Sequence, residues 1–141
     1  MKTSARNHFT GRIGSVRLGA VNDEIELELP SGERIVATIT HESTLQLGLH
    51  PGREAFALIK ASWVILFATE GAPRTSARNT FRGTVRKIAR GAVNSEVVLE
   101  LNGGASLVAI VTNTSVDELA LREGQPAGAL FKASHVIVGV E

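Results

Sequence analysis

The chain has 141 residues, with 15 Lys and Arg against 14 Asp and Glu, a formal net charge of +1 and no cysteine. The lack of cysteine excludes disulfides, zinc–thiolate sites and thiol catalysis, and balanced charge without a basic block disfavours a broad polyanion-binding surface. The sequence holds no signal-peptide apolar region and no apolar run of membrane length, so we expect a cytoplasmic protein without a membrane partner.

The first part of the chain predicts β-strands joined by short turns. Residues 9–16 mix apolar, glycine and basic side chains, and residues 24–29 alternate strictly between acidic and apolar ones, which is typical of a strand with one buried face. After the turn residues 30–33, residues 34–40 are rich in β-branched side chains. The last two strands are expected to form a hairpin.

A short helix and two more strands follow. Thr40 and Ser43 are N-cap candidates for one or two helical turns that Gly48 ends, and apolar strands are expected at 53–60 and 63–68. Five strands with a helix between the third and the fourth is the element order of an OB-type barrel.

The same order then begins again, because the chain is a tandem duplication. With an offset of 72 residues, 31 of the 67 aligned positions of 3–69 and 75–141 are identical. Such a repeat overrides the length-based expectation of one domain. We therefore expect an all-β protein of two tandem OB-like barrels, each of about five strands plus one short helix. The expected domains are 1–69 and 74–141, joined by a linker at 70–73, and units this small need each other or an oligomer for stability.

Thr-Ser-Ala-Arg-Asn occurs unchanged at 3–7 and 75–79. A guanidinium fork beside hydroxyl and backbone N–H donors suits a tetrahedral oxyanion, and the block contains no acid. A surface strand whose arginine pairs with a carboxylate would explain one copy, but intact duplication favours an anion site. The candidate residues are Ser4, Ala5, Arg6, Ser76, Ala77 and Arg78.

Two further sets are repeated intact. Lys-Ala-Ser at 60–62 and 132–134 follows a predicted strand, where a lysine reaches a ligand as a point charge; an ordinary edge-strand lysine is the alternative. The helix-start hydroxyls also recur, and although capping explains one of them, helix N-termini bind anions too. These candidates are Lys60, Ser62, Lys132, Ser134, Thr40, Ser43, Thr112 and Ser115.

Gly-Ala-Val-Asn recurs at 19–22 and 91–94. A turn explains the glycine and the asparagine, while the retained Ala and Val suggest a contact surface. Trp63 becomes His135 in the second copy, and we interpret both as packing or interface positions. None of the four histidines is retained between copies, and neither paired metal ligands nor a nucleophile with its base is repeated, so no enzyme is expected.

With these blocks the sequence closely resembles the molbindins, the Mop-domain proteins, in their tandem form, over nearly the whole chain. The resemblance implies a Mop barrel that binds molybdate and often tungstate, with no organic cofactor and no metal held directly by side chains. It also implies homotrimers with sites between Mop units. The positions matching the family's oxyanion site are the candidates above: Ser4, Arg6, Thr40, Ser43, Lys60, Ser62, Ser76, Arg78, Thr112, Ser115, Lys132 and Ser134. Anion sites on the threefold axis would fall on Ala20, Val21, Asn22, Ala92, Val93 and Asn94.

The family's module also occurs behind a helix-turn-helix in molybdate-responsive repressors and at the end of some importer ATPases. Neither attachment is expected here, so the resemblance implies intracellular molybdate storage and homeostasis. Two other functions stay open: an accessory or carrier protein for molybdenum cofactor synthesis, and an OB-fold binder of single-stranded nucleic acid. The latter needs a basic groove and exposed aromatics, which five Phe, one Trp and no Tyr disfavour, so no nucleic acid partner is expected.

Overall fold

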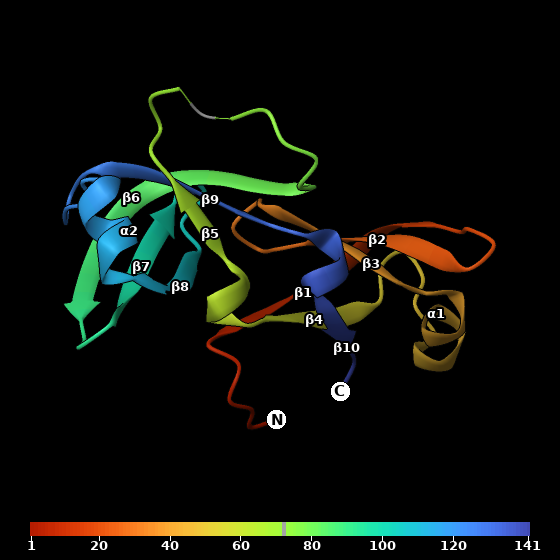
Figure 1. Ribbon diagram of the computed structural model, residues 1–141. Coiled ribbons are helices and arrows are strands. Elements are labelled where there is room, and N and C mark those ends of the chain that lie inside the picture. The colour runs from red at the N-terminus through yellow and green to blue at the C-terminus, as the bar shows by residue number, and fades with distance from the viewer. Residues whose placement is uncertain (72) are drawn as a thin grey trace. The chain divides into compact units, whose positions relative to one another are not determined.

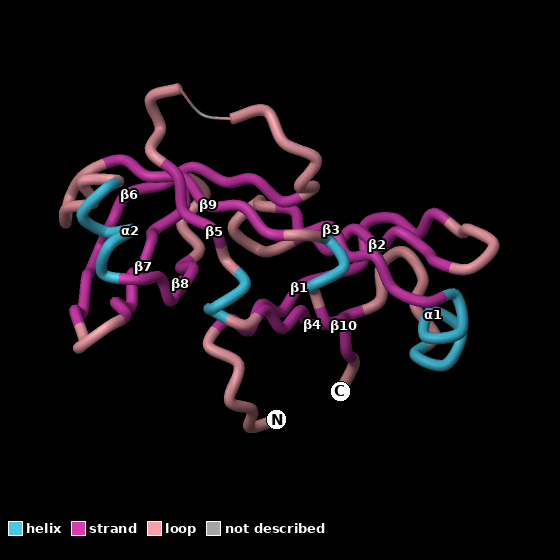
Figure 2. Tube along the Cα trace, in the orientation of Figure 1, coloured by secondary structure: helices cyan, strands magenta, loops and turns pink. Residues whose placement is uncertain are grey.

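The computed structural model describes residues 1–71 and 73–141, and half of these residues lie in β-strands (Figure 1, Figure 2). The strands are β1 (Asn7–Arg17), β2 (Asn22–Glu28), β3 (Arg34–Thr40), β4 (Glu54–Ile59), β5 (Ile65–Phe67), β6 (Asn79–Arg90), β7 (Asn94–Leu101), β8 (Ser106–Thr112), β9 (Pro126–Phe131) and β10 (Ile137–Gly139). The helices are α1 (His41–Leu47) and α2 (Asn113–Glu118), and η1 (Ala61–Trp63) and η2 (Ala133–His135) are 3-10 turns. Neither α-helix of the described residues has the length or the apolar character to cross a membrane.

The described strands form two antiparallel five-stranded sheets, in the orders β10-β4-β1-β2-β3 and β5-β9-β6-β7-β8. Each repeat supplies five strands with one α-helix between the third and the fourth, so the predicted all-β class and element order are confirmed. The predicted hairpin is formed by β2 and β3, and its counterpart by β7 and β8. The expected alternation is also present, because Ile25 and Leu27 are buried and Glu28 is exposed.

The sequence repeats and the compact units do not coincide, because the repeats exchange their last strands. β5, from the first repeat, pairs with β9, and β10, from the second, pairs with β4. One compact unit (unit 1) therefore consists of Met1–Ile59 and Lys132–Glu141, and the other (unit 2) of Lys60–Phe131. Strands of three residues carry an apolar pattern that suits either sheet edge, so the repeats at 1–69 and 74–141 do not reveal this exchange.

Close approach of strands within each sheet depends on one repeated glycine. A Cβ on Gly11 of β1 would collide with the Glu28 carbonyl of β2, and a Cβ on Gly83 of β6 with the Glu100 carbonyl of β7. Next to these glycines the pairing shifts register, between Ile13 and Ser15 in the first sheet and between Val85 and Lys87 in the second. Such bulges bend a strand and increase its twist, as a curled sheet requires.

The two helices end on different residues in the same backbone conformation. Gly48 follows α1 with a φ of 61°, and the aligned residue after α2 is Ala120, with a φ of 50°. The left-handed region is open to glycine but costs other residues about 1 kcal/mol or more. We therefore expect Ala120→Gly to raise the free energy of unfolding by about 1 kcal/mol, less a few tenths for the more flexible unfolded chain.

Urea unfolding of the variant and the parent protein tests this expectation. Gly48→Ala is the matched control, since it creates in the first repeat the arrangement that Ala120 has in the second, and it should lower the free energy of unfolding by a similar amount. A destabilised Ala120→Gly protein would contradict the strain assigned to Ala120.

Candidate anion site

Each α-helix begins with a pair of hydroxyl groups in contact. Thr40 Oγ1 accepts a hydrogen bond from the Ser43 N–H at 3.1 Å and lies 2.7 Å from Ser43 Oγ. Thr112 Oγ1 accepts from the Ser115 N–H at 3.0 Å and lies 2.8 Å from Ser115 Oγ. The predicted capping role is confirmed for both threonines. Within each pair one hydroxyl donates to the other, so one hydroxyl hydrogen at each helix start is left to donate to a ligand.

Unit 2 contains a pocket of about 420 Å³ at the start of α2. Its polar lining residues are Ser62, Asn94, Thr112 and Ser115, and the rest of the lining is aliphatic: Val64, Ile65, Leu66, Ile110, Val111 and Leu119. Ser62 belongs to the first repeat and Thr112 to the second, so the strand exchange creates this combination. A mainly apolar pocket with a few convergent polar groups is the usual form of a small-ligand site.

Unit 1 has the corresponding elements. η2, which contains Ser134, packs against β3, the strand that ends at Thr40, just as η1 packs against β8 in unit 2. Lys60 and Lys132 directly precede the two 3-10 turns with nearly the same backbone angles, φ −66° and ψ 133° against φ −72° and ψ 140°. Both lysines are exposed, as a charge available to a ligand must be.

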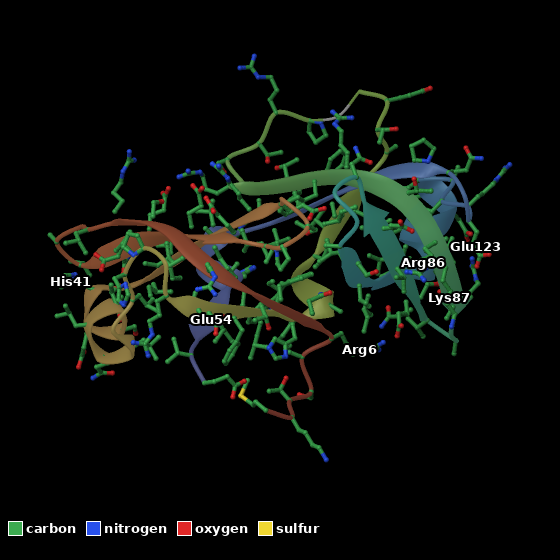
Figure 3. All side chains as sticks on the ribbon, turned by 180° about the vertical axis from the view of Figure 1, so that it is seen from behind. Arg6, His41, Glu54, Arg86, Lys87 and Glu123 are labelled. Atoms are coloured by element: carbon green, nitrogen blue, oxygen red, sulfur yellow. The ribbon has the colours of Figure 1, made fainter. Side chains whose placement is uncertain are left out.

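The arginine blocks lie away from these hydroxyls within their own units. Arg6 directly precedes the first residue of β1, whereas Thr40 pairs with Asn22, beside the far end of β1 at Arg17. β1 has 11 residues, which corresponds to about 35 Å of strand. Figure 3 shows Arg6 and His41, the residue after Thr40, well apart within unit 1. Unit 2 repeats the arrangement, since Arg78 precedes β6 and Thr112 pairs with Asn94.

The arginine blocks share one local geometry. The Ala5 N–H donates to Thr3 Oγ1 at 3.2 Å, and the Ala77 N–H donates to Thr75 Oγ1 at 3.2 Å. The asparagine that ends each block is buried, which gives its retention a structural reason. The serine and the arginine of each block are exposed: Ser4, Arg6, Ser76 and Arg78.

The Gly-Ala-Val-Asn loops sit directly beside the helix starts. The Val21 carbonyl accepts from the first N–H of α1 at 2.8 Å, and the Val93 carbonyl accepts from that of α2 at 2.9 Å. The side chains of Val21 and Val93 are 73% and 71% exposed. Asn94, expected on a threefold axis, lines the unit 2 pocket with Thr112. The hairpin register, in which Asn94 pairs with Thr112, was the signal that could have placed it there.

The two loops are anchored by different chemistry. In the first repeat the Asp23 carboxylate, 1% exposed, accepts from the Gly19 N–H at 2.9 Å and lies 2.9 Å from His41 Nδ1. In the second repeat the aligned residues are neutral, and the Ser95 hydroxyl donates to Asn113 Oδ1 at 2.6 Å. Burial alone raises the pKa of Asp23, but hydrogen bonds from Thr44, Gly19 and His41, with the charge of His41, outweigh it, so that the pKa is lowered. Sequence reasoning did not find this pair.

Acid should therefore weaken the first loop anchor more than the second. A carboxyl group whose folded-state pKa is lowered stabilises the fold above its ordinary pKa of about 4, and that stabilisation is lost as the pH falls through the folded value. Asp23→Ser/His41→Asn, which copies the second repeat, should show a shallower loss of unfolding free energy below about pH 4 than the parent protein. Urea unfolding between about pH 2 and 7 measures both slopes, and equal slopes would contradict the role given to Asp23.

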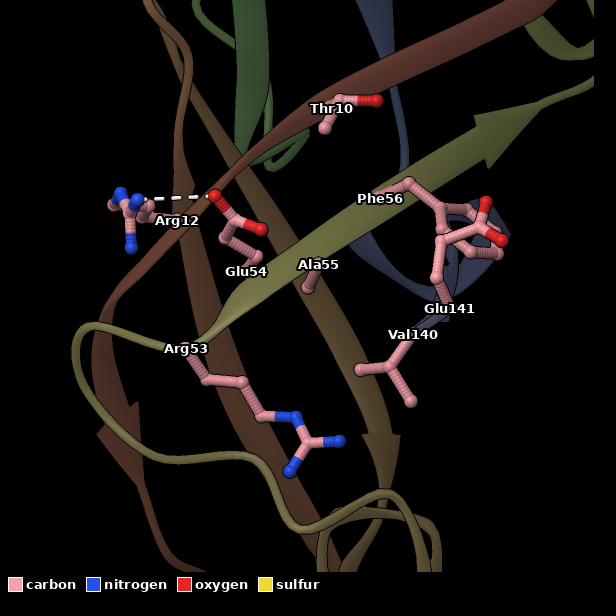
Figure 4. A pocket seen from close by; sticks show the side chains of 8 residues that line it. All are labelled: Thr10, Arg12, Arg53, Glu54, Ala55, Phe56, Val140 and Glu141. Carbon is pink, nitrogen blue, oxygen red and sulfur yellow. Dashed lines mark hydrogen bonds and ion pairs between the residues drawn. The ribbon is translucent and has the colours of Figure 1, made fainter.

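A second depression, of about 440 Å³, lies in unit 1 and has a different character (Figure 4). Arg12 and Arg53 line it together with Glu54 and Glu141, and Arg12 Nη2 lies 3.0 Å from Glu54 Oε1. Two carboxylates make this surface unfavourable for a dianion. Among the described residues, no cluster of three or more His, Asp or Glu could hold a metal ion.

Comparison with known proteins identifies the fold and the repeat. A model of the TOBE domain matches residues 3–66 and 75–138. The molybdenum-pterin-binding protein MopA of Rhodobacter capsulatus is 48% identical over 140 residues, which are 99% of this chain and 53% of MopA. The molybdenum transport protein ModE of Herbaspirillum seropedicae is 45% identical over 141 residues, 100% of this chain and 52% of ModE. The chain thus spans about half the length of these curated relatives.

Among solved structures, the cytoplasmic molybdate-binding protein ModG, with molybdate bound, has 45% identity and a TM-score of 0.95, with 100% of both chains covered. The predicted resemblance to tandem Mop-domain proteins is confirmed by these matches. The chain therefore belongs to the TOBE domain family and carries two such domains in tandem.

Proposed function

We propose that this protein is a non-catalytic, cytoplasmic oxyanion-binding protein that takes up molybdate for storage and homeostasis. The observation that carries the proposal is the 45% identity over the full length of ModG, a protein with molybdate bound. The pocket in which Ser62, Thr112 and Ser115 meet supports it, because these hydroxyls are the repeated polar residues that the sequence singles out.

The chemistry of the proposed site suits a tetrahedral dianion. The hydroxyl groups and backbone N–H groups donate hydrogen bonds, and Lys60 and the arginine block supply positive charge. In the proposal, the unit 2 site uses Lys60, Ser62, Thr112 and Ser115, and the unit 1 site uses Lys132, Ser134, Thr40 and Ser43. Tungstate has the same charge and nearly the same size, so it is proposed to bind in the same way.

The arginine blocks imply that each site is completed from elsewhere. Arg6 directly precedes β1, and Thr40, the last residue of β3, lies beside the opposite end of β1. We therefore infer that the arginine that meets a given helix start comes from a different unit or a different copy of the chain. Exposed apolar residues near the helix starts and on the edge strands offer surface for such assembly: Leu18, Val21, Leu45, Ile65, Val93 and Ile137. We infer a homotrimer with sites between Mop units and further anion sites at 20–22 and 92–94.

Elemental analysis tests the function directly. Protein purified from cells grown with added molybdate should carry molybdenum in fixed stoichiometry, without the absorption of an organic chromophore, and should elute as a trimer. Metal-free protein, or protein whose molybdenum always accompanies a pterin chromophore, would overturn the proposal, the second result in favour of a cofactor carrier.

A further inference from the structure

The ammonium group of Lys60 lies over the ring of Trp63, with Nζ 5.2 Å from the ring centroid. A cation at that distance from a ring face is attracted by the negative face of the π-system, and tryptophan is the best of the aromatic partners. Trp63 is the one tryptophan of the sequence, and it stands between Ser62 and Val64, which both line the unit 2 pocket. The ring thus belongs to the same short turn as the proposed anion site.

The second repeat provides an internal comparison. The backbone N–H of Trp63 donates to the Lys60 carbonyl at 3.0 Å, and the backbone N–H of His135 donates to the Lys132 carbonyl at 3.0 Å. The residues before both turns also share nearly the same backbone angles. The two turns therefore differ in the aromatic side chain and not in the backbone. Imidazole is a smaller ring that becomes a cation on protonation, so it attracts a nearby ammonium group less than indole does.

We infer that Trp63 is a positioning residue that holds the Lys60 ammonium for the anion, and that its replacement by His135 makes the two classes of site unequal. The ring restricts the rotamers of a flexible side chain but leaves its full positive charge available, whereas a carboxylate partner would neutralise that charge. A lysine held in this way loses less freedom when the anion binds. The Lys60 class is accordingly the tighter one. This inference rests on the proposed function of Lys60.

A set of four proteins tests the inference, all in a Lys132→Ala background that weakens the other class of site. The first carries no further change, the second carries Trp63→His, the third carries Lys60→Ala, and the fourth carries both substitutions. Calorimetry with molybdate measures the affinity of each protein. Trp63→His should weaken binding about two- to fivefold, the strength of a cation–π contact at an exposed position. In the Lys60→Ala background the same substitution should have no effect, because the coupling between the two side chains is then absent. Trp63→Phe should restore part of the affinity.

A reciprocal variant covers the case in which Trp63→His fails to fold. His135→Trp in a Lys60→Ala background should tighten the Lys132 class by a similar factor. Unchanged affinity in both variants, or an equal loss with and without Lys60, would overturn the positioning role while leaving molybdate binding intact. Absence of molybdate binding in the parent protein would overturn the proposed function as well, so the two failures are distinguishable.

Discussion

Replacing both Lys60 and Lys132 by alanine is expected to weaken molybdate binding at least about thirtyfold without unfolding the protein. Removing one partner of a desolvated charge pair costs about 2–5 kcal/mol, because the other charge is left unpaired. Both lysines are exposed, and neither side chain makes a capping hydrogen bond to the 3-10 turn that follows it. We therefore expect the fold to tolerate the loss of both side chains.

Isothermal calorimetry on the double variant measures this effect. Lys87→Ala is the control, since Lys87 is an exposed lysine on β6 that does not line the pocket, and its removal lowers the net charge by one, as each single replacement in the double variant does. The control should bind with parental affinity. If the double variant also keeps parental affinity and stoichiometry, neither lysine belongs to the site.

The second large effect concerns which anions bind. No acid belongs to the repeated set, and the hydroxyls of Ser62, Thr112 and Ser115 and the ammonium of Lys60 can all donate to an anion. The Asn94 amide, which also lines the pocket, can present its NH2 group. Phosphate near neutral pH keeps a proton that needs an acceptor, and an unpaired buried donor costs about 1–3 kcal/mol. Phosphate should therefore bind about five- to 140-fold more weakly than molybdate. Sulfate carries no proton but has shorter bonds, which stretches its hydrogen bonds.

Competition calorimetry of molybdate against tungstate, selenate, sulfate, arsenate and phosphate separates the effect of the anion's proton from the effect of its bond length. Selenate is larger than sulfate and unprotonated, whereas arsenate is larger than phosphate and protonated. The expected order is molybdate and tungstate first, then selenate, sulfate and the two protonated anions. Arsenate that binds better than selenate, or phosphate that binds as tightly as molybdate, would mean that the site contains an acceptor, and the molybdate assignment would lose its physical support.

Much of the fold could be predicted because it depends on short-range patterns. The alternation at 24–29 and the β-branched run at 34–40 gave β2 and β3 within two residues, and the hydroxyl groups of Thr40 and Thr112 are the caps that the sequence suggested. The repeat itself gave the second sheet. These features are decided by neighbouring residues, so one sequence is enough to recognise them.

The strand exchange could not be predicted, because it depends on which sheet edge a short strand meets. β5 and β10 have three residues each, and the repeated sequence supplies an equivalent edge in both sheets. The exchange decides the site, since it places Ser62 of the first repeat with Thr112 of the second. The contact of Lys60 with Trp63 also escaped the sequence, because it is a tertiary placement rather than a motif.

Anomalous scattering from crystals grown with molybdate tests the central claim most directly, because it locates molybdenum atoms without assumptions about the ligand. The account predicts a molybdenum peak within hydrogen-bond reach of Ser62, Thr112 and Ser115, with a guanidinium of Arg6 or Arg78 reaching it from a different unit or a different copy. The corresponding peak should lie beside Ser134, Thr40 and Ser43. Molybdenum found instead in the depression lined by Arg12 and Glu54, or no ordered molybdenum at any helix start, would contradict it.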